Sequence, residues 1–446
     1  MEAELKKTLG PFMLWGLGVG YVISGMYFGW NLGLPYGGPF GFLIATLLVT
    51  VMYVTFVLTY AELSCALPKA GGAHYYAATA FGKEIGFIAG IAQCIEFLFA
   101  PPAIAAAIGA YFNIFFPEIS PLAIAITAYF IFTGLNIYGV KHSAIFELVI
   151  TVLAVIELLI FAGITLPHFS FEAFSKNPLP HGWGGVLPAI PFAIWFYLAI
   201  EGIANVAEET KNPQRDLARG FGSAMATLVF LALLTFFSSV GVNGWESVVY
   251  KGSSSVTSDS PLPLALAHVV GEDHMFYHLL ITIGLCGLLA SFHGIILVAG
   301  RATFEFGRLG HAPKVLSFTL PKRKTPAPAL LFNMAIGFLA LLSGRTSEII
   351  LVSVFGALTM YVVSILSFFK LRKEKPNLKR PFRTPFYPWV SLVALLLSTF
   401  SLLVMAYYNL AIAGVFVGIL IISRVISLFT NLVTNRGIVW RKKTAN

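Results

Sequence analysis

The sequence predicts an all-α integral membrane protein with about twelve transmembrane helices, and three observations support this fold class. Hydrophobic residues make up 57% of the chain and charged residues only 11%, so a water-soluble globule of this length would lack the polar surface to cover itself. Apolar runs of the roughly 20 residues that a spanning helix requires recur throughout the chain. The Lys and Arg residues gather in alternate loops, which excludes a nucleic-acid-binding explanation of the positive net charge.

The predicted spans follow the apolar runs. In chain order they cover residues 11–38, 40–66, 83–115, 121–139, 142–167, 184–209, 217–242, 275–304, 327–343, 347–369, 387–408 and 411–433. About 25 of the 29 Lys and Arg residues then fall on the side of both termini. Since basic loops stay in the cytoplasm, we expect a multi-pass protein of the cytoplasmic membrane with both termini inside.

Motifs of catalysis or of metal binding are missing from the sequence. There is no Walker loop, nucleophile elbow or His-Glu-x-x-His motif, and the external histidines lack metal-ligand spacing. Cys65, Cys94 and Cys286 lie inside or at the edge of apolar runs, as small core residues do. We therefore expect no enzymatic activity, no cofactor and no bound metal.

The first span contains the pair Ser24-Gly25 near its middle, flanked by further glycines. Glycine lowers helix stability, and backbone groups freed inside a membrane must find partners within the protein. Close packing through small residues explains this span alone equally well. The sixth span, however, sets Glu201 beside Gly202 at a comparable depth, and two interrupted helices five spans apart are typical of inverted repeats that meet at a midplane substrate site.

This pattern divides the chain into three parts. Residues 1–167 form an N-terminal repeat of five helices, and residues 184–369 form the second, inverted repeat. Residues 370–446 hold a basic cytoplasmic loop, two additional helices and the C-terminal tail.

Two blocks of sequence resemble the amino acid-polyamine-organocation (APC) permeases, and the resemblance covers nearly the whole chain. The first block runs from Tyr60-Ala-Glu62 through Gly71-Gly72 to residue 87, and the second covers residues 205–216. Within the family, the first, fifth and eighth spans look most like the ethanolamine permease branch. The resemblance implies the five-plus-five inverted-repeat fold with discontinuous first and sixth helices, and transport by alternating access.

The chain departs from amino acid permeases at two positions. Their Gly-Ser-Gly, whose amides receive a carboxylate, falls at Ser24-Gly25-Met26, where Met26 adds bulk against an approaching anion. Proton-coupled relatives have a lysine near position 154, where this chain has Ala154. The sequence is therefore compatible with transport coupled to H⁺, with transport coupled to Na⁺ and with exchange that needs no coupling ion.

Ionisable residues within the hydrocarbon region are costly and are candidates for function. Glu96 and Glu201 are expected to surround a small ammonium group together with aromatic walls; hydrogen bonding to a helix break and proton carriage are the alternatives. His293 either lines the cavity, titrates during transport or is a packing histidine. The predicted substrate site comprises Ile23, Ser24, Gly25, Met26, Glu96, Trp195, Tyr197, Glu201, Gly202 and His293.

Two further acids lie in the fifth span and are left out of this site. Glu157 is expected to have a structural role beside an unidentified partner. Glu147, closer to the cytoplasmic end, is expected to reach water or Lys141. At the cytoplasmic helix ends, a gate or capping network is expected from Glu62, Glu208, Glu209, Lys211 and Arg215.

The most favoured function is uptake or exchange of ethanolamine or a similar small amine by a secondary transporter. The runner-up is an amino acid permease or exchanger of the same fold. A sensor or channel that retains the fold is a third reading, although neither tail resembles a signalling domain. The partners implied are a small-molecule amine and the lipid bilayer, and the oligomeric state cannot be read from the sequence.

Overall fold

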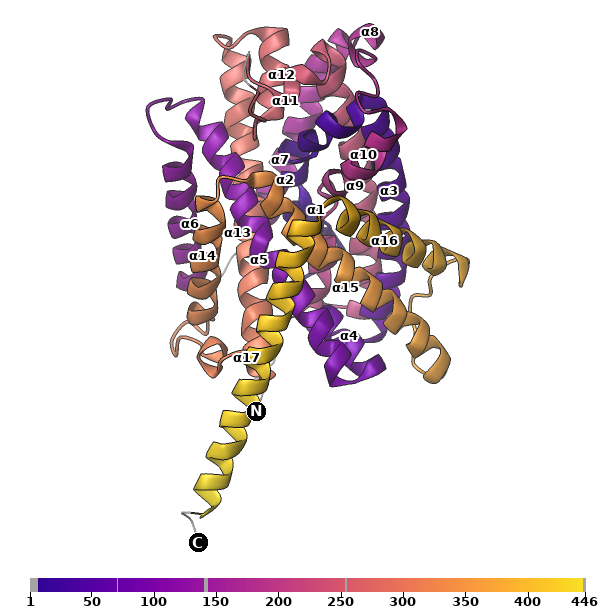
Figure 1. Cartoon of the computed structure of the whole chain (residues 1–446), viewed down its shortest axis with the longest axis vertical. Helices are drawn as coiled ribbons and strands as arrows, with labels where there is room; N and C mark the ends of the chain where they lie inside the picture. The colour runs from indigo at the N-terminus through magenta and orange to yellow at the C-terminus, as the bar shows by residue number, and fades with distance from the viewer. Residues whose placement is uncertain (1–6, 70, 140–142, 253–254, 444–446) are drawn as a thin grey trace.

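The computed structural model describes residues 7–69, 71–139, 143–252 and 255–443, and within these ranges it is helical without a β-strand (Figure 1). The longer helices are α1 (Pro11–Val22), α3 (Leu34–Ala66), α5 (Lys83–Asn113), α6 (Pro121–Tyr138), α7 (Ser143–Thr165), α9 (Val186–Ile194), α10 (Pro213–Asn243), α13 (Met275–Arg308), α14 (Ala327–Leu342), α15 (Thr346–Glu374), α16 (Trp389–Tyr408) and α17 (Leu410–Lys443). Short helices connect them: α2 (Ser24–Tyr27), η1 (Trp30–Gly33), α4 (Gly72–Phe81), η2 (Leu166–His168), α8 (Phe171–Phe174), η3 (Gly182–Gly185), η4 (Ile200–Glu209), α11 (Glu246–Val249), α12 (Pro261–Val270) and η5 (Lys314–Ser317).

Each predicted span has a helical counterpart, but not each is a single long helix. Of the described segments, nine are long and apolar enough to cross a membrane by themselves. The other predicted spans are the broken pairs α1–α2 and α9–η4, and the short helix α14 of 16 residues. The all-α membrane transporter fold predicted from the sequence is confirmed.

The predicted end of the first span, at residue 38, is wrong. The helix ends at Tyr27, Phe28 is extended, and Gly29 has a φ of 87° before η1 begins. The next span starts in α3 at Leu34 and bends at Gly38, whose φ is 60°. Hydropathy misses this boundary because the residues between the two spans are as apolar as the helices, while glycine alone permits the positive φ without strain.

The break of the sixth span lies just before the position predicted from Glu201-Gly202. Helix α9 ends at Ile194, residues 195–199 form turns, and η4 follows as a 3₁₀ helix. The left-handed residue is Ala199, with a φ of 77°, rather than a glycine. Gly202 serves another purpose: a Cβ there would lie 3.0 Å from the Tyr21 ring, so it allows η4 to pack closely against α1.

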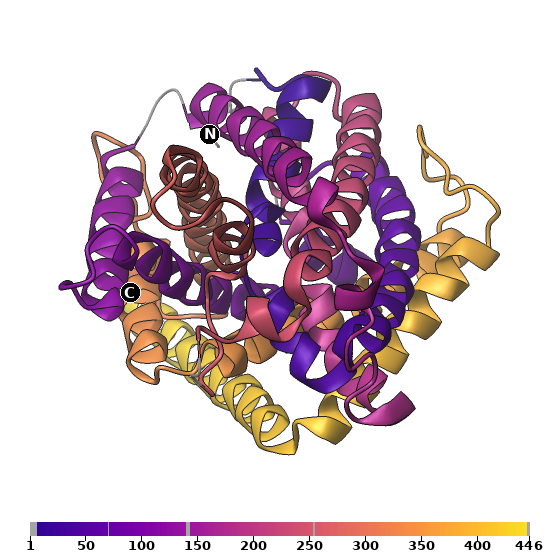
Figure 2. The same cartoon turned by 90° about the horizontal axis from the view of Figure 1, so that it is seen from above.

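The two ends of the bundle differ in their short helices. Helices α8, α11 and α12 cover one end, and α4 lies at the opposite end, toward which the last turns of α17 point (Figure 1). The segment before α1 reaches the α4 end as well, because Leu9 pairs with Thr210 and α4 packs against η4. Helices α16 and α17 lie at the edge of the bundle (Figure 2), where most of their surface is available to lipid.

Candidate substrate site

The two broken helices cross at their breaks. The α-carbon of Gly25 lies against the backbone carbonyl of Trp195, so closely that a Cβ at residue 25 would overlap it. The Trp195 ring packs edge-on against Phe28, with 5.4 Å between centroids, and it leaves room only for a glycine at residue 29. The interruptions that the sequence placed in separate spans therefore meet at one point of the bundle, as inverted-repeat transporters require.

Two buried carboxyl groups adjoin one another beside this crossing. Glu96 of α5 and Glu201 of η4 are both 0% exposed, and their carboxyl groups lie close enough to interact electrostatically. Oε2 of Glu201 accepts a hydrogen bond from the Tyr361 hydroxyl at 3.0 Å. Within the described part of the chain, no hydrogen bond reaches either oxygen of Glu96 or Oε1 of Glu201.

Helix α15 holds this pair in place. Gly356 lets α15 approach the backbone of α5 at Ala92 and Glu96, where a Cβ would be too close. One turn earlier, the Ser353 hydroxyl donates to the Glu96 carbonyl at 2.8 Å. Since Tyr361 lies on the same helix, this close packing also sets the hydroxyl against Glu201.

Tyrosines form the wall beside the carboxyl groups. The Tyr53 hydroxyl lies 3.1 Å from that of Tyr361, and the Tyr53 ring packs 5.2 Å from the ring of Tyr197. The hydroxyl of Tyr197 lies 2.7 Å from Oγ1 of Thr50. Sequence reasoning named Tyr197 but missed Tyr53 and Tyr361, since tyrosines inside apolar runs give no signal of which ones will meet a buried acid.

The backbone at the first break is already partly engaged. The Met26 amide donates to the Ile23 carbonyl at 2.9 Å. Oγ of Ser291, on α13, lies 2.8 Å from both Oγ of Ser24 and the carbonyl oxygen of Tyr21. Ser24 is thus held by α13, and the Met26 amide is not free for a carboxylate in this conformation.

His293 pairs with an acid outside the predicted site. Its Nδ1 lies 3.9 Å from Oε2 of Glu147, and both side chains are buried. The expectation that Glu147 reaches water is wrong, because Glu147 is 1% exposed. The alternative partner, Lys141, lies outside the described residues. The partner of Glu157 is Tyr27, whose hydroxyl donates to Oε2 at 2.6 Å and so ties α7 to the end of α2.

The predicted cytoplasmic network separates into distinct contacts. Glu62 accepts hydrogen bonds from Arg372 at 2.6 Å and from the Thr384 amide at 2.7 Å, and its Oε1 lies 3.3 Å from Nε of Arg380. Glu209 pairs with Arg301 of α13 at 2.9 Å.

The remaining members of that network do not join Glu62. Glu208 lies 3.8 Å from Lys69 across a largely exposed ion pair. The Lys211 amide donates to the Leu9 carbonyl, and the side chains of Lys211 and Arg215 are exposed. Among the ion pairs of the described residues, Glu209 contacts Arg301, a residue outside the predicted network, rather than Arg215.

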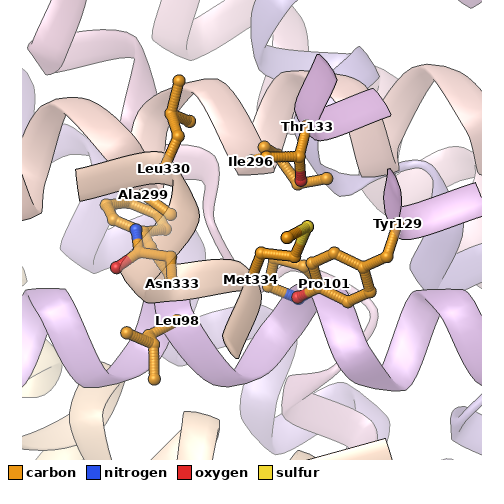
Figure 3. A pocket seen from close by; sticks show the side chains of 10 residues that line it. Leu98, Pro101, Tyr129, Thr133, Ile296, Ala299, Leu330, Asn333 and Met334 are labelled. Atoms are coloured by element: carbon orange, nitrogen blue, oxygen red, sulfur yellow. The ribbon is translucent and has the colours of Figure 1, made fainter. Parts of the chain in front are cut away.

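A small cavity lies elsewhere, among α5, α6, α13 and α14 (Figure 3). Thr133 and Asn333 line it together with apolar residues such as Leu98 and Met334. Its volume of about 10 Å³ is sufficient for roughly one water molecule and too small for an organic substrate. The candidate site remains the crossing of the broken helices, where every predicted binding residue is buried, so access requires the helices to move.

Comparison with known proteins agrees with this architecture. A family model described as amino acid permease matches residues 9–433. An uncharacterized transporter of Rhizobium meliloti is 28% identical over 88% of this chain and 85% of its own length. The branched-chain amino acid permease of Bacillus subtilis is 26% identical over 90% and 89%, and the low-affinity putrescine importer of Escherichia coli is 26% identical over 87% and 86%. The chain belongs to the amino acid permease family of the APC superfamily, whose members are membrane transporters.

Proposed function

We propose that this permease carries a small primary amine, ethanolamine or a similar amino alcohol, by alternating access. The observation that carries the proposal is the pair Glu96 and Glu201, two adjoining carboxyl groups that are fully buried and largely without hydrogen bonds. None of the ion pairs among the described residues involves either acid. Two neighbouring acids without a basic partner form a site that a cationic substrate would complete.

The surroundings of the acids suit an ammonium group. A small cation that leaves water needs opposing charge, hydrogen-bond acceptors and aromatic faces. Glu96 and Glu201 supply the charge, while the rings of Tyr53, Tyr197 and Tyr361 supply the wall. The substrate hydroxyl would lie toward Ser24 and the backbone of the first break, which opens when α13 releases Ser24.

An amino acid remains the second candidate, since the branched-chain amino acid permease of Bacillus subtilis is similar over most of both chains. The structure offers an observation against it in this conformation: the Met26 amide is bonded to Ile23. A relative described as a putrescine importer shows that amine substrates occur among the similar proteins.

Counterflow in proteoliposomes separates the candidates. Vesicles loaded with unlabelled ethanolamine should accelerate the entry of radiolabelled ethanolamine, a behaviour of carriers that an open pore lacks. Alanine at the same concentration should compete weakly. Strong block by alanine together with no ethanolamine exchange would reverse the ranking in favour of an amino acid substrate.

Substitutions of the two acids test the site itself. Glu96→Gln and Glu201→Gln should each lower ethanolamine exchange by about 100-fold or more, because each removes a charged partner of the ammonium group. Glu157→Gln is the matched control, since Glu157 is also a buried acid but bonds to Tyr27. Equal losses in all three variants would contradict the assignment of the ammonium site.

A further inference from the structure

Another buried acid, Glu147, lies apart from the Glu96–Glu201 pair and takes no part in the proposed substrate contacts. Glu147 of α7 faces His293 of α13 across 3.9 Å, and the two side chains are 1% and 4% exposed. Neither Oε1 of Glu147 nor Nδ1 of His293 has a hydrogen-bond partner among the described residues. We infer that this pair is the proton-binding site that couples transport to a proton gradient, an inference that rests on the proposed transport function.

The space for the carboxyl group is built by glycines of two other segments. A Cβ at Gly20 of α1 would lie 2.9 Å from Oε1 of Glu147, and one at Gly294 of α13 would lie 3.0 Å from it. Helices α1, α7 and α13 pack against one another around this point. The acid therefore occupies a niche that any larger side chain at either glycine would close.

The chemistry of the niche favours a proton over a metal cation. Sodium requires several oxygen ligands, whereas Oε2 of Glu147 faces the imidazole of His293. The Thr151 hydroxyl, which borders the same niche at Gly20, donates to the Gly16 carbonyl at 3.3 Å. An imidazole and a carboxylate that together hold one proton carry no net charge, so the pair needs only a proton to be neutral. Loss of that proton leaves a single buried negative charge, which is tolerable only when water reaches the niche.

The other groups around the pair do not supply a competing permanent charge. From α6, the Asn136 side chain donates to the His293 carbonyl at 3.4 Å, and the Phe132 ring packs against the imidazole. From α1, Tyr21 interacts electrostatically with Glu147 and also with Arg301 and Glu209. Arg301 itself is paired with Glu209 at 2.9 Å, so its charge is already matched.

These contacts also suggest the route of the proton. Arg301 lies on the same helix as His293, about 12 Å nearer the end of the bundle that holds α4. Tyr21 is close enough to interact electrostatically both with Glu147 and with the Arg301–Glu209 pair. In each cycle one proton from external water binds to the Glu147–His293 pair. The same proton leaves to water at the α4 end when Arg301 and Glu209 separate.

Coupling to substrate follows from the position of α1. Gly20 contacts the Glu147 niche, and Gly25, five residues further along, contacts the carbonyl of Trp195 at the candidate substrate site. The intervening Tyr21 carbonyl and the Ser24 hydroxyl are both held by Ser291 of α13. A movement of α1 that opens one site must therefore disturb the other, which is the requirement for linked binding.

The test uses full-length protein in liposomes that contain a pH-sensitive dye, with radiolabelled ethanolamine as the probe. For the wild type, an inward proton gradient should raise accumulation several-fold, dye acidification should accompany uptake, and a sodium gradient should do neither. Glu147→Gln should reduce gradient-driven accumulation at least tenfold more than it reduces exchange at equal pH. His293→Gln should also reduce gradient-driven accumulation more than it reduces exchange at equal pH.

Glu157→Gln on the same helix is the control and should keep the wild-type ratio of accumulation to exchange, since Gln can still accept from Tyr27. The inference is overturned if Glu147→Gln keeps full gradient stimulation, or if sodium rather than protons drives the wild type. Should Glu147→Gln fail to fold, absence of dye acidification during wild-type uptake overturns it equally. If alanine rather than ethanolamine exchanges, the proposed substrate is wrong. The proton site is then tested by the same measurements with radiolabelled alanine as the probe.

Discussion

Gly25 and Trp195 bring the two broken helices into direct backbone contact, with the α-carbon of one against the carbonyl of the other. Side chains normally keep helix axes about 8–10 Å apart, so this contact depends on residue 25 being a glycine. The contact fixes the distance between Ser24 of the first break and Glu201 of the sixth span.

A methyl group at residue 25 should therefore separate the two breaks. We expect Gly25→Ala to abolish substrate exchange and to destabilise the protein by about 1–3 kcal/mol, the range for overpacking a close contact. Thermal unfolding in detergent and counterflow measure the two effects. Gly163→Ala is the control, since a Cβ there meets nothing within 4 Å; a fully active Gly25→Ala variant would contradict the proposed geometry.

The hydroxyl of Tyr361 should matter through its hydrogen bond to Glu201. Removal of a donor to a charged acceptor costs about 1.5–3 kcal/mol, so Tyr361→Phe should raise the KM for substrate by about tenfold or more. Initial uptake rates across a concentration series measure this change. Tyr407→Phe, at a side chain that is 74% exposed on α16, should leave KM unaltered, and a normal KM in Tyr361→Phe would remove this tyrosine from the site.

The contact between Glu62 and the basic loop after α15 should be a major source of stability. Glu62 is buried and contacts both Arg372 and Arg380, so Glu62→Gln removes the one negative charge that both guanidinium groups face. Breaking such a pair costs about 3–5 kcal/mol, and the melting temperature in detergent should fall by several degrees. Glu374→Gln removes an exposed pair with Lys370 and should change stability by no more than about 1 kcal/mol; similar effects of both would contradict a special role for Glu62.

The loop between α11 and α12 that contains Asp259 should become less stable as pH rises. Burial raises the pKa of Asp259 from 3.8 to about 6, while a hydrogen bond from Thr346 opposes that rise. Between pH 4 and 6 the folded protein therefore binds more protons at this residue than the unfolded chain, so its contribution to stability is full below pH 4 and is lost as pH rises to about 6.

Asp259→Asn keeps an oxygen that accepts from Thr346 but removes the titration. We expect the melting temperature of the wild type to contain a component that falls between pH 4 and pH 6, and the variant to lack it. The difference between the two melting curves across that range is the measurement. Parallel curves would show that Asp259 does not titrate in this interval.

Local sequence features predicted the helical class well because burial in lipid imposes a simple rule. Every backbone group must be bonded within the chain, so apolar runs near 20 residues become helices, and each predicted span has its helix. Glycine and polar residues also identified which spans would break. The position of each break was less accurate: Ala199 adopts the left-handed conformation two residues before Glu201, and no residue type announces that.

The sequence by itself thus determined the class of protein and the two acids, Glu96 and Glu201, that the fold brings together. Only the tertiary structure decided which side chains these and other buried polar residues contact. His293 pairs with Glu147, Glu62 with Arg372, and Tyr361 with Glu201. Each pair joins residues far apart in the chain. Glycines 20, 294 and 356 set how closely the helices approach at two of these contacts, a property of packing that hydropathy and residue spacing do not contain.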